Sequence, residues 1–109
     1  MSDVLQQLMV TLAARRQADP EQSYVASLHH KGLNKILEKV GEEATEVMLA
    51  AKDAAAGGDR GAVINEMADL WFHTLVLLSH LDLDLDEVMQ CLSDRSGVSG
   101  LDEKAARSK

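Results

Sequence analysis

Apolar side chains recur three or four positions apart along most of this 109-residue chain, which is the spacing of amphipathic helices. Glycines and the single proline interrupt the pattern and divide it into segments. The pattern predicts five helices, over Ser2 to about Arg15, Asp19 to Gly32, Asn34 to about Ala56, about Arg60 to His80, and Asp84 to about Leu92.

Polar residues at the start of three segments can cap them. Asp19 is a good N-cap, and Pro20 suits the first helical position because its missing N–H costs nothing there. Asn34 can cap the third helix in the same way. Asp84 and Glu87 have the spacing of a capping box. The caps therefore agree with the apolar pattern on where these helices begin.

The two long helices are joined by the tight Gly57-Gly58-Asp59 connection, so we expect them to pack antiparallel. Aromatic residues make up only 3% of the chain, which disfavours a β-sandwich or barrel. We therefore predict one all-α domain over residues 1–96, a helical bundle, followed by a Gly-, Ser- and charge-rich tail over residues 97–109. A chain this short buries only about two-thirds of its unfolded surface, which favours a homo-oligomer.

The formal net charge of -7 argues against nucleic-acid binding, which needs a basic surface. An acidic chain still binds phosphates when a cation mediates. The longest uncharged apolar stretch, Leu70 to Leu81, is shorter than the roughly 20 residues of a membrane span. The lone Cys91 cannot form an internal disulfide, and the N-terminus lacks a signal-peptide pattern. We therefore expect no membrane partner and a cytoplasmic setting.

Carboxylates of the helix from Asn34 point where a core is expected. On a helical wheel, Ile36, Val40 and Val47 define the centre of its apolar face. Glu43 falls within about 20–60° of all three. A buried, unpaired carboxylate is costly unless a cation or a shifted pKa compensates for it. Local helix stability therefore does not explain this acidic residue.

The helix from Arg60 to His80 is apolar around nearly its whole circumference, which predicts that it is buried on most sides. Its polar residues fall within a sector of about 60°. They are Glu66, Asp69, His73 and His80. Since apolar residues flank this strip, we do not expect it to be an open solvent face.

Two facing helices with inward carboxylates predict a box of oxygen ligands. Mg²⁺ prefers such oxygens and usually combines a few of them with substrate phosphates. The functional interpretation is that four carboxylates hold Mg²⁺, namely Glu43, Glu46, Glu66 and Asp69. The alternative is a set of solvated acidic faces. Lys39 can pair with Glu42 or Glu43 and account for one of them, but it does not account for the acidic strip of the other helix.

Lysines recur every four residues at the start of the same helix, at Lys31, Lys35 and Lys39. Such a row is typical of a surface, yet beside a metal–phosphate site it can neutralise phosphate charge. His73, taken alone, is more typical of a hydrogen-bonded core histidine than of a ligand. The pattern leaves both alternatives open.

The run from Glu42 to Glu46, followed by Glu66 to Asp69, resembles the EExxE…ExxD signature of the all-α nucleotide pyrophosphohydrolases. Further segments, which extend the resemblance over nearly the whole chain from Val4, are similar to the phosphoribosyl-ATP pyrophosphatase family. They are Ser23 to Ala26, Gly32 to Lys35, Lys39 to Ala44, Ala68 to His73, Val76 to Leu78 and Gly97 to Ala105. One departure is Trp71-Phe72, where the family often has Leu-Tyr, so any hydrogen bond of that tyrosine is absent.

The resemblance implies hydrolysis of phosphoribosyl-ATP to phosphoribosyl-AMP and pyrophosphate, the second step of histidine biosynthesis. It also implies a Mg²⁺-dependent homodimer whose helices combine into four-helix clusters. It assigns metal ligation to the four carboxylates above, and Glu42 to completing the cluster or positioning water. We expect Glu42 or Glu46 to accept the proton of the attacking water. Lys35, Lys39 and His73 are candidate contacts to the nucleotide substrate.

Three other classes compete with this interpretation. A di-iron bundle expects Glu-x-x-His pairs, which this sequence lacks. A non-enzymatic helical interaction module explains the apolar stripes but not the core-facing carboxylates. A housekeeping nucleoside triphosphate pyrophosphohydrolase shares the acidic motif, and only the flanking segments favour phosphoribosyl-ATP over it.

Overall fold

A computed structural model describes residues 2–96 of the chain. Within those residues there are five helices and no strand, which confirms the all-α prediction. The helices are α1 (Ser2–Arg15), α2 (Tyr24–Lys31), α3 (Leu33–Ala55), α4 (Arg60–His80) and α5 (Leu85–Arg95). The predicted tail, residues 97–109, lies outside the described residues.

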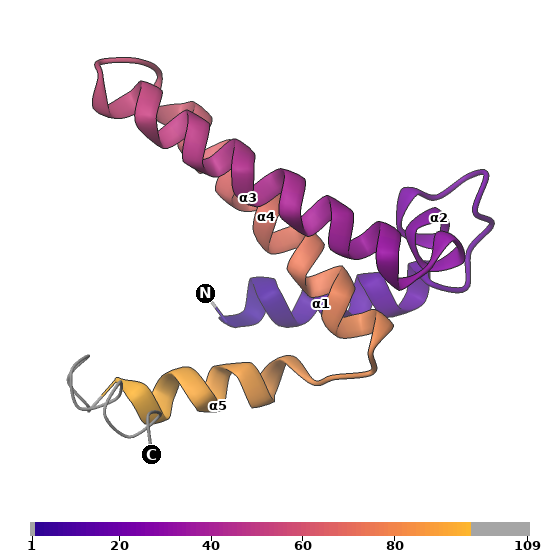
Figure 1. Cartoon of the computed structure of the whole chain (residues 1–109). Coiled ribbons are helices and arrows are strands. Elements are labelled where there is room, and N and C mark those ends of the chain that lie inside the picture. The colour runs from indigo at the N-terminus through magenta and orange to yellow at the C-terminus, as the bar shows by residue number, and fades with distance from the viewer. Residues whose placement is uncertain (1, 97–109) are drawn as a thin grey trace.

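The long helices α3 and α4 form an antiparallel hairpin, as predicted (Figure 1). Its turn depends on two glycines. Gly57 has φ +98°, which side chains disfavour. A Cβ atom on Gly58 would approach the carbonyl oxygen of Asp53 to 2.7 Å. Asp59 then caps α4 by accepting a 2.8 Å hydrogen bond from the backbone N–H of Gly61.

The predicted start of the second helix at Asp19 is wrong. The Asp19 carbonyl accepts from the N–H groups of Gln22 and Ser23, so this segment is a turn. Ser23, in extended conformation, is the actual N-cap, and its hydroxyl accepts a 3.2 Å hydrogen bond from the Ala26 N–H. An Asp-Pro pair is found at the start of turns as well as helices, and Ser23, four residues after Asp19, caps α2 instead.

The predicted cap at Asn34 is also wrong, because α3 already begins at Leu33. Gly32 ends α2 and starts α3. Its N–H donates to the Leu28 carbonyl, and its own carbonyl accepts from the Ile36 N–H. Its φ of 100° and ψ of -177° lie in a region that is essentially restricted to glycine. The capping box of Asp84 and Glu87 at α5 is confirmed.

The core lies at the base of the hairpin, where α1 and α2 pack against it (Figure 1). It consists of Leu12, Val25, Leu28, Ile36, Leu75, Val76 and Leu85. Further along the hairpin, large apolar side chains are exposed, including Ile64 at 72% and Trp71 at 55%. The single chain therefore does not bury α4 on most sides, and its burial by a partner chain stays a prediction.

A polar joint, formed by Arg16, His29 and His80, closes the base of the hairpin, and no pattern along the chain predicted it. Arg16 donates 2.7 Å and 3.0 Å hydrogen bonds to the Ser79 carbonyl and to Asp82. Beside it, His29 of α2 and His80 of α4 stack, with their Nδ1 atoms 3.0 Å apart. One nitrogen must donate and the other accept, so this contact requires at least one bare nitrogen. Burial, then Arg16 and His80, lower the pKa of His29.

Acidification should weaken this joint. Since the folded-state pKa of His29 lies below the unfolded value of about 6.5, the unfolded chain takes up the proton first. The stabilisation is complete above about pH 6.5 and is lost as pH falls toward the folded pKa. We predict that the melting temperature of His29→Gln falls less between pH 7.5 and pH 5.5 than that of the unchanged protein. The exposed neighbour provides the control: His30→Gln should retain the full drop, and equal drops in all three proteins would contradict the assignment.

Candidate metal and nucleotide site

Glu43 is the most deeply buried charged residue of α3. It lies on the same face as the core residue Ile36 and is only 7% exposed. Its Oε1 atom is 3.5 Å from the Lys39 ammonium. Its Oε2 atom is buried and has no hydrogen-bond partner among residues 2–96. A buried carboxylate oxygen left in this way is costly, so the site favours an additional cation.

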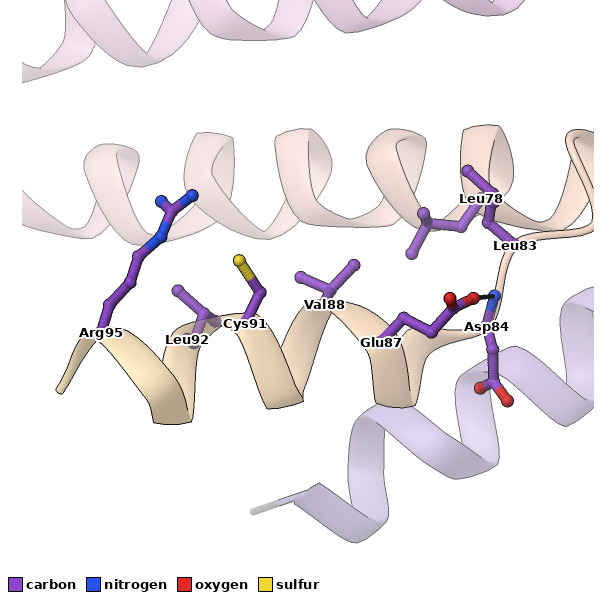
Figure 2. A pocket seen from close by; sticks show the side chains of 8 residues that line it. All are labelled: Leu78, Leu83, Asp84, Glu87, Val88, Cys91, Leu92 and Arg95. Atoms are coloured by element: carbon purple, nitrogen blue, oxygen red, sulfur yellow. Dashed lines mark hydrogen bonds between the residues drawn. The ribbon is translucent and has the colours of Figure 1, made fainter. Parts of the chain in front are cut away.

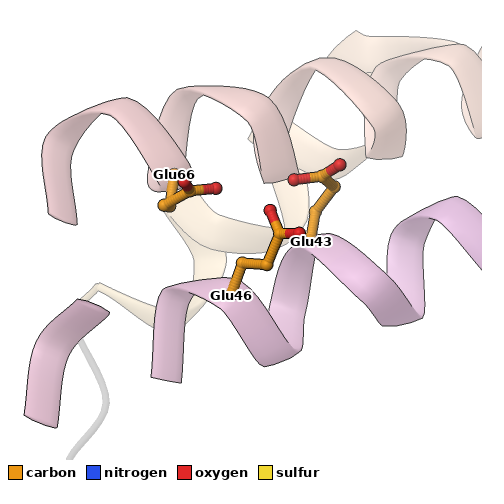
Figure 3. A group of neighbouring side chains, drawn as sticks. All are labelled: Glu43, Glu46 and Glu66. Carbon is orange, nitrogen blue, oxygen red and sulfur yellow. The ribbon is translucent and has the colours of Figure 1, made fainter. Parts of the chain in front are cut away.

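Two further carboxylates meet Glu43 (Figure 3). Glu46 follows on the next turn of α3, and Glu66 reaches across from α4. Oxygen atoms of the three side chains lie within 4.8 Å of one another. Like Glu43, Glu66 has a buried Oε2 atom for which the described part of the chain offers no hydrogen bond. Three negative charges this close repel one another, and a divalent cation relieves that repulsion.

Asp69 lies outside this carboxylate cluster. Its side chain is exposed, one turn along α4 from Glu66, so the expectation that the whole polar strip is closed is wrong at this position. Its backbone carbonyl is engaged instead, 2.7 Å from Nδ1 of His73. Metal ligation by the Asp69 carboxylate stays a prediction.

The lysines already have acidic neighbours. Lys39 donates a 3.0 Å hydrogen bond to Glu42, which lowers the pKa of that exposed carboxyl group and raises the pKa of Lys39. Lys35 is 3.3 Å from Glu38. Of the two, Lys39 borders the cluster, since its ammonium group is also 3.5 Å from Glu43.

His73 is 6% exposed, and both its ring nitrogens have protein partners. Nδ1 meets the Asp69 carbonyl, and Nε2 lies 2.8 Å from the hydroxyl of Tyr24 on α2. Burial is the main cause that raises the pKa of Tyr24, and Lys39 and Glu43 are the next largest influences on it. His73 thus tethers Tyr24 beside the charged groups of α3.

Comparison with known proteins agrees with this geometry. The family model for phosphoribosyl-ATP pyrophosphohydrolase matches residues 5–96. The chain belongs to this family. A phosphoribosyl-ATP pyrophosphatase of Ralstonia nicotianae is 56% identical over 114 residues, covering 98% of this chain and 92% of that protein.

The family motif and the carboxylate cluster coincide on α3 and α4. The phosphoribosyl-ATP pyrophosphohydrolase match spans every candidate site residue, from Lys35 to His73. Sequence reasoning did not predict the contact between Tyr24 and His73, although the segment from Ser23 was part of the resemblance. A residue whose partner lies 49 positions away leaves no periodic signal.

Several hollows border α4, and two of them differ in chemical character. An acidic one of about 280 Å³ continues from the cluster toward the hairpin turn, where Asp53 and Asp59 join Glu46 and Glu66. A second, mainly apolar hollow of about 410 Å³ lies between α4 and α5 and includes Cys91 (Figure 2). The two share no lining residue. Within residues 2–96 no helix has the length and apolarity to cross a membrane.

The cluster predicts opposite effects of charge removal with and without Mg²⁺. In chelator, Glu43→Gln and Glu66→Gln should leave the melting temperature unchanged or raise it, because carboxylate repulsion is relieved. Mg²⁺ at a hundredfold excess over its Kd should stabilise the unchanged protein by about 2.7 kcal/mol, worth several degrees, and the variants much less.

Glu38→Gln, on the same helix but paired with Lys35, is the control and should keep the full Mg²⁺ response. If the cluster variants instead lost stability in chelator and responded normally to Mg²⁺, the glutamates would be partners in structural ion pairs.

Proposed function

We propose that this chain hydrolyses phosphoribosyl-ATP to phosphoribosyl-AMP and pyrophosphate, the second step of histidine biosynthesis. The observation that carries the proposal is the cluster of Glu43, Glu46 and Glu66, with two buried oxygens unpartnered in the described chain, inside the family match. The name of the relative from Ralstonia nicotianae supports the substrate. The unpaired Cys91 supports the cytoplasm as the place of reaction.

Mg²⁺ is the proposed cofactor because the donors are hard carboxylate oxygens. Glu43, Glu46 and Glu66 would hold it, and Asp69 is proposed to join them after its side chain turns. Bound there, Mg²⁺ neutralises the charge of the triphosphate and polarises its phosphoryl oxygens. The buried position of Glu43 keeps this ligand fixed, whereas the exposed Glu46 can also meet solvent.

The attacking water needs a proton acceptor, and Glu42 and Glu46 are the candidates. Both are exposed on α3 beside the buried Glu43. In the free chain, the hydrogen bond from Lys39 lowers the pKa of Glu42 and fixes the direction of its carboxylate. Glu46 is closer to the metal ligands, since it is one of them in this proposal. An ionised, oriented carboxylate is what general-base catalysis requires.

Lys35 and Lys39 are proposed to contact the phosphates. Each now lies against a glutamate, 3.3 Å and 3.0 Å away. An anionic phosphate accepts charge-assisted hydrogen bonds as a carboxylate does, so it could take the place of either glutamate, and Lys39 would then release Glu42 as a proton acceptor. His73 serves the substrate through Tyr24 in this arrangement, because its own nitrogens are occupied.

Substrate and products distinguish this proposal from a housekeeping pyrophosphohydrolase. With phosphoribosyl-ATP and Mg²⁺, we expect stoichiometric pyrophosphate and phosphoribosyl-AMP and no orthophosphate, with activity lost in chelator. Chromatography and a coupled pyrophosphate assay measure this. Faster turnover of ordinary nucleoside triphosphates than of phosphoribosyl-ATP would favour the housekeeping enzyme, and no turnover of either would favour the interaction module.

The proposed active form is a homodimer. The outer part of the hairpin exposes Met48, Leu49, Ile64 and Trp71 to solvent in the single chain. A second hairpin laid against these side chains would complete a four-helix cluster and bury them. At about 25 cal/mol per Å² of apolar surface, such burial is a large stabilisation for a domain of this size.

We predict a dimer by sedimentation velocity at low micromolar concentration. Ile64→Asp should produce monomers, because it places a charge on the exposed apolar face of α4. Val10 of α1 is exposed to the same degree, 71% against 72%, so Val10→Asp is a matched control and should remain dimeric. A stable monomer of the unchanged protein would rule out this assembly.

A further inference from the structure

The contacts of His73 give the Tyr24 hydroxyl a fixed direction. A carbonyl oxygen only accepts hydrogen bonds, so the proton of neutral His73 must be on Nδ1, 2.7 Å from the Asp69 carbonyl. Nε2 is then a bare acceptor, and the Tyr24 hydroxyl 2.8 Å away must donate to it. The Tyr24 hydroxyl therefore donates its proton to His73, and the lone pairs of the Tyr24 oxygen can accept a hydrogen bond from another group.

The Tyr24 ring is held on two sides. It stacks on Phe72 with the ring centroids 6.4 Å apart and the planes at 17°. It meets His73 edge-on at 5.8 Å. Even so, Tyr24 is 51% exposed, while His73 behind it is buried. A fixed but accessible ring is suited to contacting a ligand from outside.

The hydroxyl also lies beside the proposed catalytic groups. Its partner His73 contacts the backbone carbonyl of Asp69, one turn along α4 from Glu66. Lys39 and Glu43 of α3 are the charged groups that most affect the pKa of the hydroxyl. A substrate bound to the carboxylate cluster and the lysines would come within the neighbourhood of this oxygen.

We propose that Tyr24 contacts the nucleoside part of the substrate, where its oxygen accepts a hydrogen bond from a hydroxyl or amino group, and that His73 is its positioning residue. The inference rests on the proposed function. Phosphate oxygens are ruled out as partners because an ionised phosphate has no proton to donate, whereas sugar hydroxyls and the adenine amino group have. Phosphates are left to the lysines and the metal.

Tyr24→Phe tests the contact, because it removes the oxygen and keeps the stack on Phe72. Loss of one neutral hydrogen bond should raise KM for phosphoribosyl-ATP about 3- to 10-fold and leave kcat within about twofold. Inhibition by phosphoribosyl-AMP should weaken by the same factor. Inhibition by Mg²⁺-pyrophosphate should not change, because pyrophosphate has no nucleoside part.

The positioning role of His73 is tested by a pair of variants. His73→Leu removes the acceptor and should raise KM as Tyr24→Phe does, and the double variant should show no further rise. His73→Gln can place its amide oxygen near the position of Nε2 and should restore KM toward the original value. A purely structural histidine would lower the melting temperature without this shared, non-additive change in KM.

Three outcomes would overturn the inference. If the original protein is active and Tyr24→Phe has the same KM, the proposed contact of Tyr24 is wrong, while the proposed function stands. Weaker inhibition by Mg²⁺-pyrophosphate in Tyr24→Phe would mean that the hydroxyl serves the phosphates instead. Failure of the unchanged protein to hydrolyse phosphoribosyl-ATP would remove the proposed function, and this inference with it, before any variant is compared.

Discussion

The close placement of Glu43, Glu46 and Glu66 is the constraint that the α3–α4 hairpin has to accommodate. It sets acidic oxygens within 4.8 Å of one another where two helices pack, and buries two of them without partners in residues 2–96. A hairpin selected for stability alone would place apolar side chains there. Lys39, 3.5 Å from Glu43, offsets part of this charge, and the proposed cation would neutralise the remainder.

The residues that stabilise the fold and the residues of the proposed site lie at different places along α3 and α4. At the base, Leu12, Leu28, Ile36 and Val76 form a dry core and the joint of Arg16, His29 and His80 closes it. The outer hairpin carries the carboxylates and exposed apolar side chains instead. The base therefore stabilises the domain, and the outer hairpin is available for ligand and partner.

Helical periodicity predicted the all-α class and the long hairpin because both follow from local spacing. It also placed Glu43 on the buried face, since Ile36 fixes that face two turns earlier. The starts at Asp19 and Asn34 failed because several residues in a row could cap, and only the backbone geometry decided between them.

The site was predictable only where one helix or two adjacent turns define it. Glu46 and Glu66 follow from wheel and motif. The exposure of Asp69 and the bond between Tyr24 and His73 depend on how α2 and α4 pack, which spacing along the chain does not encode. The substrate class was inferred from the family resemblance, because no local pattern of residues indicates it.

The turn at Gly57 and Gly58 has a consequence for how the acidic cluster forms. Because it joins α3 directly to α4, Glu43, Glu46 and Glu66 meet within one hairpin, whereas the core also needs α1 and α5. Contacts closer along the chain cost less loop entropy than distant ones. The acidic cluster therefore needs only the hairpin to form, and a cation that neutralised it would stabilise the hairpin directly.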